Sequence, residues 1–77
     1  MTQYAGIDVS KATLDVCLVP AGTERQFPRD EAGLKALTAW LQEVPLGSVV
    51  MEASGGYEQA VAAALAAGGL PVVVSNP

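Results

Sequence analysis

The chain has 77 residues, of which 51% are hydrophobic and 16% are charged, and its four basic and eight acidic residues give a net charge of −4. This composition predicts one compact, core-forming domain and excludes a disordered tail. A chain of this length buries only about 60% of the surface that its unfolded form exposes, so we expect marginal stability or a partner that covers apolar surface. The acidic balance argues against a surface that holds nucleic acid by neutralising phosphates.

Targeting signals and cysteine usage exclude several further classes. No apolar run approaches the roughly 20 residues of a membrane span, and the start MTQYAGID lacks the features of a signal peptide. We therefore expect a cytoplasmic protein without a membrane partner. The chain has no histidine, and its single cysteine, Cys17, is expected to be a buried, inert thiol, so a structural zinc site is excluded.

The first 28 residues predict three antiparallel strands. The run at 4–9 (YAGIDV) is apolar except for one acid, and a polar break of hairpin length follows at 10–12. Residues 13–19 alternate between an apolar face and a second face, with Leu14, Val16 and Leu18 on the first and Thr13, Asp15 and Cys17 on the second. After a turn at 20–23, the short, charged run 24–27 suits a strand at a sheet edge.

Two helices and two further strands follow. Asp30 is a plausible N-cap for an amphipathic helix over 31–43, whose apolar stripe comprises Leu34, Leu37, Leu41 and Val44 with Trp40 beside it. The apolar run 47–53 predicts a strand buried on both faces. The alanine-rich stretch 57–67 predicts a helix closed by the glycines at 68–69, and 70–74 (LPVVV) a last strand with its proline near the start.

The handedness of crossovers converts this βββαβαβ order into a topology. Strand three runs parallel to strand one, so a right-handed crossover through the first helix places strand four beside strand one, and a second places strand five outside strand four. The predicted α/β fold is a mixed five-stranded sheet of order 3-2-1-4-5 with strand two antiparallel. Ribonuclease-H-like folds share this core arrangement.

Three of the eight carboxylates are unusually placed. Five lie at turns, helix ends or expected exposed helix positions, where solvation explains them: Glu24, Asp30, Glu31, Glu43 and Glu58. Asp8, Asp15 and Glu52 instead interrupt strand-like apolar runs. A buried, unpaired carboxylate costs several kcal/mol, so each of these three needs a cation, a donor or access to water.

Asp8 and Glu52 lie near the carboxyl ends of strands that the topology makes parallel neighbours. Ligands of open α/β sheets bind at that end, and two carboxylates without a lysine or arginine on their strands favour Mg²⁺ or Mn²⁺. A two-metal site for phosphoryl transfer needs more ligands than these two. The alternative is that both acids merely accept backbone N–H bonds; Asp15 is better explained as a polar-face residue or a hydrogen-bond acceptor.

The stretch GIDVSKATLDVCL, followed by VVMEASGGYE and then VVVSNP, closely resembles the N-terminal domain of DEDD transposases of the Piv/MooV type, the insertion-sequence-110 group. The resemblance covers essentially the whole chain, and the combination of GIDVSK with MEASGGYE is highly specific. It implies a RuvC-like fold and a catalytic, metal-binding set of Asp, Glu, Asp and Asp, with Asp8 as the first acid and Glu52 as the second.

The resemblance also implies a larger parent protein. The last two acids, and a further domain bearing a serine implicated in strand chemistry, would lie beyond Pro77, so residues 1–77 are expected to be a catalytically inactive part of a ribonuclease-H-like domain. The parent would be a Mg²⁺- or Mn²⁺-dependent enzyme that cleaves and joins DNA during transposition. Its implied partners are DNA, at the element ends and the target, and a structured guide RNA.

Other polar residues have weaker signals. Ser10 and Lys11 could contact a phosphate near the metals, although a solvated turn explains them equally well. Ser54, Gly55 and Gly56 precede a helix whose N-terminus could hold an anion, but a tight turn capped by Ser54 or its neighbour is the simpler interpretation. Tyr57 could stack on a base, but at the first turn of a helix it is expected to pack on its own domain, and Trp40 is expected in the core or an interface, so neither supports base recognition.

Two other classes of function stay open at this stage. Sugar-kinase and actin-type ATPase domains open with a similar hairpin on the same sheet order, although their turn normally offers glycine to phosphate and residues 10–12 contain none. A non-catalytic module that self-associates is the other alternative. An uncovered sheet face or last-strand edge predicts homo-oligomers.

Overall fold

A computed structural model of the chain describes residues 1–52 and 55–75. Five strands and two helices follow one another in the predicted order. They are β1 (Gln3–Val9), β2 (Thr13–Val19), β3 (Thr23–Pro28), α1 (Glu31–Gln42), β4 (Leu46–Glu52), α2 (Tyr57–Ala67) and β5 (Val72–Ser75). The last strand begins two residues later than predicted and leaves Pro71 outside it, where the proline carbonyl accepts a hydrogen bond from the Val49 amide at 2.8 Å.

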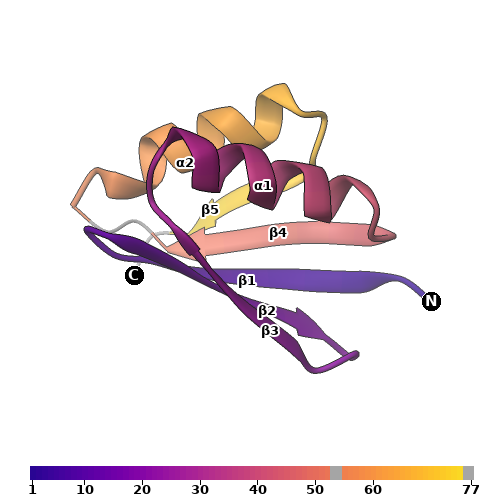
Figure 1. Cartoon of the computed structure of the whole chain (residues 1–77). Coiled ribbons are helices and arrows are strands. Elements are labelled where there is room, and N and C mark those ends of the chain that lie inside the picture. The colour runs from indigo at the N-terminus through magenta and orange to yellow at the C-terminus, as the bar shows by residue number, and fades with distance from the viewer. Residues whose placement is uncertain (53–54, 76–77) are drawn as a thin grey trace.

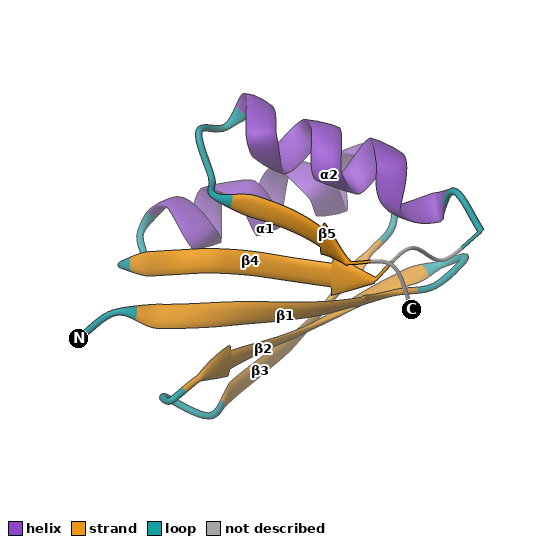
Figure 2. Cartoon of the chain, turned by 180° about the vertical axis from the view of Figure 1, so that it is seen from behind, coloured by secondary structure: helices purple, strands orange, loops and turns teal. Residues whose placement is uncertain are grey.

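The strands form one mixed sheet of order β3-β2-β1-β4-β5, as predicted. β2 is antiparallel to β1 and β3, whereas β4 is parallel to both β1 and β5. Both helices lie on the same side of this sheet, and no described element covers the other side (Figures 1 and 2). The molecule is therefore a two-layer α/β structure with the ribonuclease-H-like strand order.

The core lies between the sheet and the two helices. Every second residue of β1 and β2 points into it, and Leu37 and Leu41 of α1 meet Val61 and Leu65 of α2 there at 0% exposure. The remaining buried hydrophobic residues are Ala5, Ile7, Val9, Leu14, Val16, Leu18, Phe27, Val49 and Met51. The apolar stripe predicted for the first helix is confirmed, with Leu34, Trp40 and Val44 partly buried at its margin.

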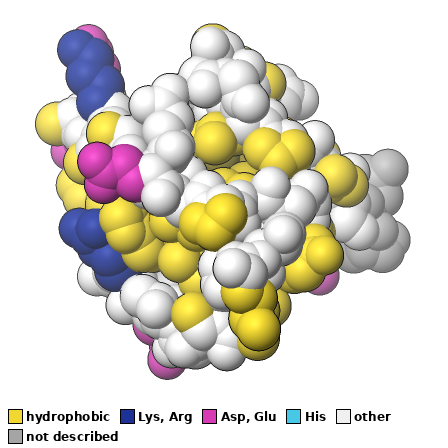
Figure 3. Space-filling model, turned by 90° about the vertical axis from the view of Figure 1, so that its right-hand side faces the viewer, with side chains coloured by type: hydrophobic (Ala, Val, Ile, Leu, Met, Phe, Trp, Pro, Cys, Tyr) yellow, Lys and Arg dark blue, Asp and Glu magenta, His cyan; other side chains and the backbone are white. Residues whose placement is uncertain are grey.

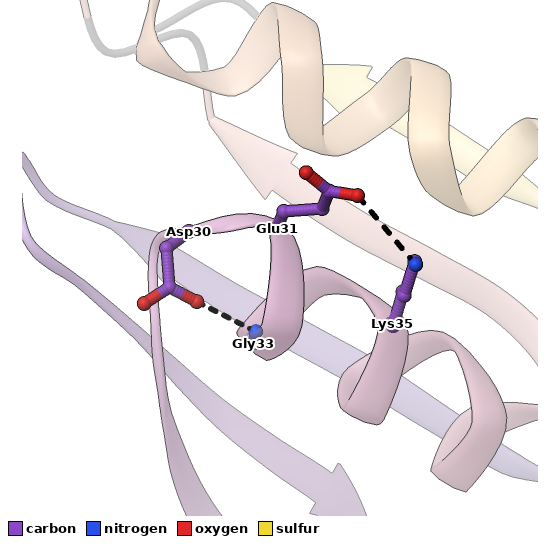
Figure 4. A network of polar contacts seen from close by, with 4 residues as sticks. All are labelled: Asp30, Glu31, Gly33 and Lys35. Carbon is purple, nitrogen blue, oxygen red and sulfur yellow. Dashed lines mark hydrogen bonds and ion pairs between the residues drawn. The ribbon is translucent and has the colours of Figure 1, made fainter.

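α1 begins where its sequence predicts. The Asp30 side chain accepts a hydrogen bond from the Gly33 amide at 2.7 Å and so satisfies one of the free donors of the first turn (Figure 4). One turn along, Lys35 and Glu31 form an exposed ion pair with 3.5 Å between nitrogen and oxygen. Such a pair contributes little to stability, so the cap and the apolar stripe define the helix.

The uncovered face of the sheet corrects one prediction. β4 was expected to be buried on both faces, but its residues alternate, with Val49 and Met51 buried and Val50 38% exposed. β4 does consist largely of apolar residues, but no described element packs against the second face of the strand. We call this side of the sheet the open face.

The end of the molecule where α1 ends and β4 begins is shown in Figure 3. Hydrophobic side chains reach the surface there between the helical layer and the sheet, while most of the charged side chains in this view gather on one flank. Leu46 and Leu70 are among the partly buried residues that pack on the core. None of the helices in the described part of the chain is long and apolar enough to cross a membrane.

Candidate functional site

The register of β1 and β4 brings Asp8 and Glu52 to the same row of the sheet. Ile7 pairs with Met51, and both are buried on the helical side. Asp8 and Glu52 are the next residue on each strand, so the alternation of side chains turns both towards the open face. Neighbouring strands lie about 4.8 Å apart, which makes the two acids cross-strand neighbours at the carboxyl end of the sheet.

The same row continues across the sheet in both directions. Asp8 pairs directly with Asp15 of β2, which pairs with Gln26 of β3, and Glu52 pairs with Ser75 of β5. These five residues, Gln26, Asp15, Asp8, Glu52 and Ser75, are called the acidic row below. The sequence pattern indicated that Asp15 belongs to a polar face, but it did not reveal that Asp15 lies opposite Asp8.

The acidic row borders a hollow of about 920 Å³ on the open face. The hollow is also lined by Gly6, Cys17 and Val50. Gly6 leaves space there, because no atom lies within 4 Å of the position that a Cβ atom would occupy. Arg25 also borders the hollow, but its guanidinium stacks on the rings of Phe27 and Trp40, 4.7 Å from each centroid, on the helical side. The acids of the hollow are therefore not neutralised by this cation.

Hydrogen bonding distinguishes Asp15 from Asp8. Asp15 accepts a bond from the Gln26 side chain at 2.8 Å, which agrees with its interpretation as a hydrogen-bond acceptor. The described residues donate no hydrogen bond to the Asp8 carboxylate. The described residues contain no group of three or more acids, cysteines or histidines arranged to hold a metal ion.

A basic and aromatic group lies at the same end of the sheet. The Arg29 side chain donates from Nε to the Lys11 carbonyl at 2.7 Å, and its guanidinium lies 4.6 Å from the centre of the Tyr57 ring. Lys11 follows Asp8 by three residues in the β1–β2 turn, and Arg29 directly follows β3. Ser10, also in this turn, bonds to Thr13 through its hydroxyl at 2.8 and 3.0 Å, so its side chain is already engaged in closing the hairpin.

The approach to α2 was another predicted site. Gly55 and Gly56 have φ of 66° and 96°, values that favour glycine, and Gly56 is the N-cap without a side-chain hydrogen bond. Ser54 lies outside the described residues. The positive φ angles of Gly55 and Gly56 thus give these two glycines a conformational role in the turn before α2.

Two residues differ from their predicted environments. Glu58 was expected to be solvated on the helix surface, yet it is 6% exposed because it shares the sheet-facing side of α2 with Val61 and Leu65. The spacing i, i+3, i+7 could have revealed this. Cys17 was expected to be buried but is partly exposed, because it points to the open face.

The sheet order, the one-sided helices and the acidic row at the carboxyl end define an α/β domain of the ribonuclease-H-like class. A family model described as a transposase, for DEDD transposases of the insertion-sequence-110 type, matches residues 5–77. The chain therefore belongs to this transposase family, as its motifs predicted.

Comparison with solved structures agrees on the fold. YeaZ from Pseudomonas aeruginosa is similar, with a TM-score of 0.50 and 13% sequence identity over 99% of this chain. At this identity the likeness concerns the fold alone. The match covers 44% of the YeaZ chain, so the present chain spans less than half of that protein. No curated protein gives a significant match.

Proposed function

We propose that the chain forms the first part of the catalytic domain of a DNA transposase, and that Asp8 and Glu52 bind a divalent metal ion there. The observation that carries this proposal is the register that turns both carboxylates to one face on adjacent parallel strands. Family membership supports the class of enzyme. It also favours a transposase over the ATPase alternative.

The donor chemistry of the acidic row fits Mg²⁺ or Mn²⁺. Both ions prefer oxygen ligands, and carboxylates supply charge as well as coordination. Asp8 and Asp15 are like charges placed directly opposite, an arrangement that a cation would relieve. Two carboxylates are fewer than a catalytic site needs, and the family resemblance implies two further acids in the complete domain.

The roles of this chain's own residues follow from their placement. Asp8 and Glu52 would hold the ion at the sheet edge, and when bound it would polarise a DNA phosphodiester and stabilise charge on the attacking or leaving oxygen. Gln26 holds Asp15 by a hydrogen bond and so keeps a third carboxylate beside Asp8. Ser10, Lys11, Ser54, Gly55 and Gly56 would contact phosphate oxygens around this edge.

Partners follow from the same proposal. The complete transposase would bind element and target DNA together with a guide RNA. The net charge of −4 supports a division in which most of the nucleic-acid contacts are made by other parts of that protein.

Binding of Mn²⁺ tests the metal site without requiring activity. In ¹H–¹⁵N spectra of the chain, Mn²⁺ should first broaden the amides around Asp8 and Glu52, and D8N or E52Q should weaken the apparent affinity about tenfold or more, because each removes a charged ligand. E24Q is the matched control, since it removes an acid from the β3 edge of the same hollow and should change little. Broadening centred elsewhere, or unaffected by D8N, would refute the assignment.

Activity tests the enzyme class. In a full-length transposase that contains this chain, D8N and E52Q should each abolish Mg²⁺-dependent DNA cleavage while leaving the fold intact. Cleavage that survives both substitutions would exclude these acids from catalysis.

Self-association is proposed for the chain as well. Tyr4, Val19, Val50 and Val73 are 38–50% exposed, and by the strand register they belong to the open face, beside the unpaired edge of β5. Light scattering over a range of concentrations should show dimers or larger species. A strict monomer at high concentration would contradict this proposal.

A further inference from the structure

We infer that Arg29, held against Tyr57 and the β1–β2 turn, binds a backbone phosphate of DNA beside the acidic row. This site rests on the proposed function, because its position matters to catalysis only if Asp8 and Glu52 bind the metal. Arg29 belongs neither to the family motifs nor to the phosphate contacts proposed above, and Tyr57, which stands in the motif MEASGGYE, has so far been given no role.

Arg29 is fixed at three points. Its amide donates to the Ala12 carbonyl at 2.8 Å, its Nε donates to the Lys11 carbonyl at 2.7 Å, and its guanidinium lies over the Tyr57 ring at 4.6 Å. Arginine loses much side-chain entropy when it is ordered, and here that cost is met within the folded chain. The side chain is thus preorganised before any ligand binds.

The terminal nitrogens of Arg29 remain available. The described residues offer no acceptor to them and no carboxylate forms an ion pair with Arg29 or Lys11, whereas Lys35 pairs with Glu31. A guanidinium bonded through Nε still presents N–H groups in a plane, the geometry that recognises two phosphate oxygens. Phosphate is therefore the ligand chemistry that fits.

The location links this cation to the proposed metal site. The β1–β2 turn, the end of β3 and the start of α2 all lie at the end of the molecule where β4 and β5 terminate (Figures 1 and 2). Lys11 and Arg29 are thus two basic residues at the carboxyl end that also carries Asp8 and Glu52. A DNA strand that is held here by one phosphate would pass the end of the sheet that also carries the acidic row.

Titration of a single-stranded DNA oligonucleotide into the ¹⁵N-labelled chain, in buffer containing EDTA, tests the site directly. The Nε–H signal of Arg29 and the amides of residues 10–12 should shift, and the Nε–H signal of Arg25 should not. Arg25 is a matched internal control, because it is also an arginine stacked on aromatic rings. Shifts centred on Arg25, or no shift at any concentration, would overturn the inference.

Variants measure the contribution of each part. R29Q should weaken DNA binding about tenfold or more, since a hydrogen-bonded charge is lost, and should reduce the salt slope of log K by about 0.7. R29K should retain the salt slope but bind less tightly than the original chain, because lysine cannot reproduce the stacked fork. R25Q should match the original chain, and equal losses in R25Q and R29Q would show a general charge effect instead.

The aromatic partner provides a second check. Y57F keeps the ring and should bind DNA as the original chain does, whereas Y57A should weaken binding. A matched RNA oligonucleotide should bind no more tightly than DNA; a marked preference for RNA, or binding of inorganic phosphate with equal affinity, would overturn the assignment to DNA.

The two proposals fail in different ways. The DNA titration contains no free metal, so loss of Mn²⁺ binding in D8N leaves the expected Arg29 shifts unchanged. Absence of the Arg29 shifts together with normal Mn²⁺ binding would remove the phosphate site and leave the metal site standing.

Discussion

The two faces of the sheet are built from the same strands, yet they have opposite chemistry. On the helical face, the three central strands β1, β2 and β4 contribute a core of apolar side chains at 5% exposure or less, from Ala5 to Met51. The open face carries three carboxylates in one row, together with the exposed side chains of Val50 and, at the far end of β1, Tyr4. Acids can occupy one side because alternation isolates it from the core, so a strand can stabilise the fold and hold a functional group at adjacent positions.

The largest expected contrast is in packing. L37A should lower the free energy of unfolding by about 2–5 kcal/mol, because Leu37 is fully buried and its loss leaves a cavity. V50A on the open face should cost less than about 1 kcal/mol. Urea unfolding followed by Trp40 fluorescence measures both, and similar losses would mean that the open face is covered in solution.

Glycine substitutions sharpen the comparison. Alanine normally stabilises a helix by about 1 kcal/mol relative to glycine, but a Cβ at Gly33 would lie 1.8 Å from the Pro28 carbonyl oxygen. G33A should therefore destabilise by about 1–3 kcal/mol. G6A meets no atom within 4 Å on the open face and should be neutral or stabilise by up to about 1 kcal/mol. Thermal unfolding measures both variants, and a lower melting temperature for G6A than for G33A would contradict this expectation.

The smallest effect concerns charge. D15N should raise the free energy of unfolding by about 0.2–1 kcal/mol in metal-free buffer, because it removes a like charge opposite Asp8 and keeps the oxygen that Gln26 contacts. E24Q, whose cross-strand partner is Cys17, should change stability less. An increase of equal size in E24Q would point to net charge rather than to the Asp8–Asp15 pair.

Local patterns predicted most of the fold. The alternation in β2, the helical spacing of Leu37 and Leu41, and the Asp30 cap each depend on neighbours in sequence, and the structure confirms all three. The sheet order followed because crossover handedness leaves few topologies for a βββαβαβ chain. It also brought Asp8 and Glu52 to neighbouring strands.

Environment was harder to predict than secondary structure. Val50 lies in an apolar run that reads as doubly buried, but burial depends on whether another element covers the second face. Glu58 was expected to be exposed because it is charged. Its position on α2 instead places it on the buried side of the helix, with Val61 and Leu65. Periodicity predicts which face of a strand or helix a side chain occupies, whereas the exposure of that side chain depends on whether another element packs against the face.

The sequence by itself determined the elements, the strand order, the family and the two acids of the motifs, because these depend on periodicity, turn chemistry and local residue types. Only the tertiary structure decided that Asp15 lies opposite Asp8 and that Arg29 stacks on Tyr57. Asp8 and Asp15 are 7 positions apart in the sequence, and Arg29 and Tyr57 are 28 positions apart. The register and packing of the folded sheet bring the members of each pair together.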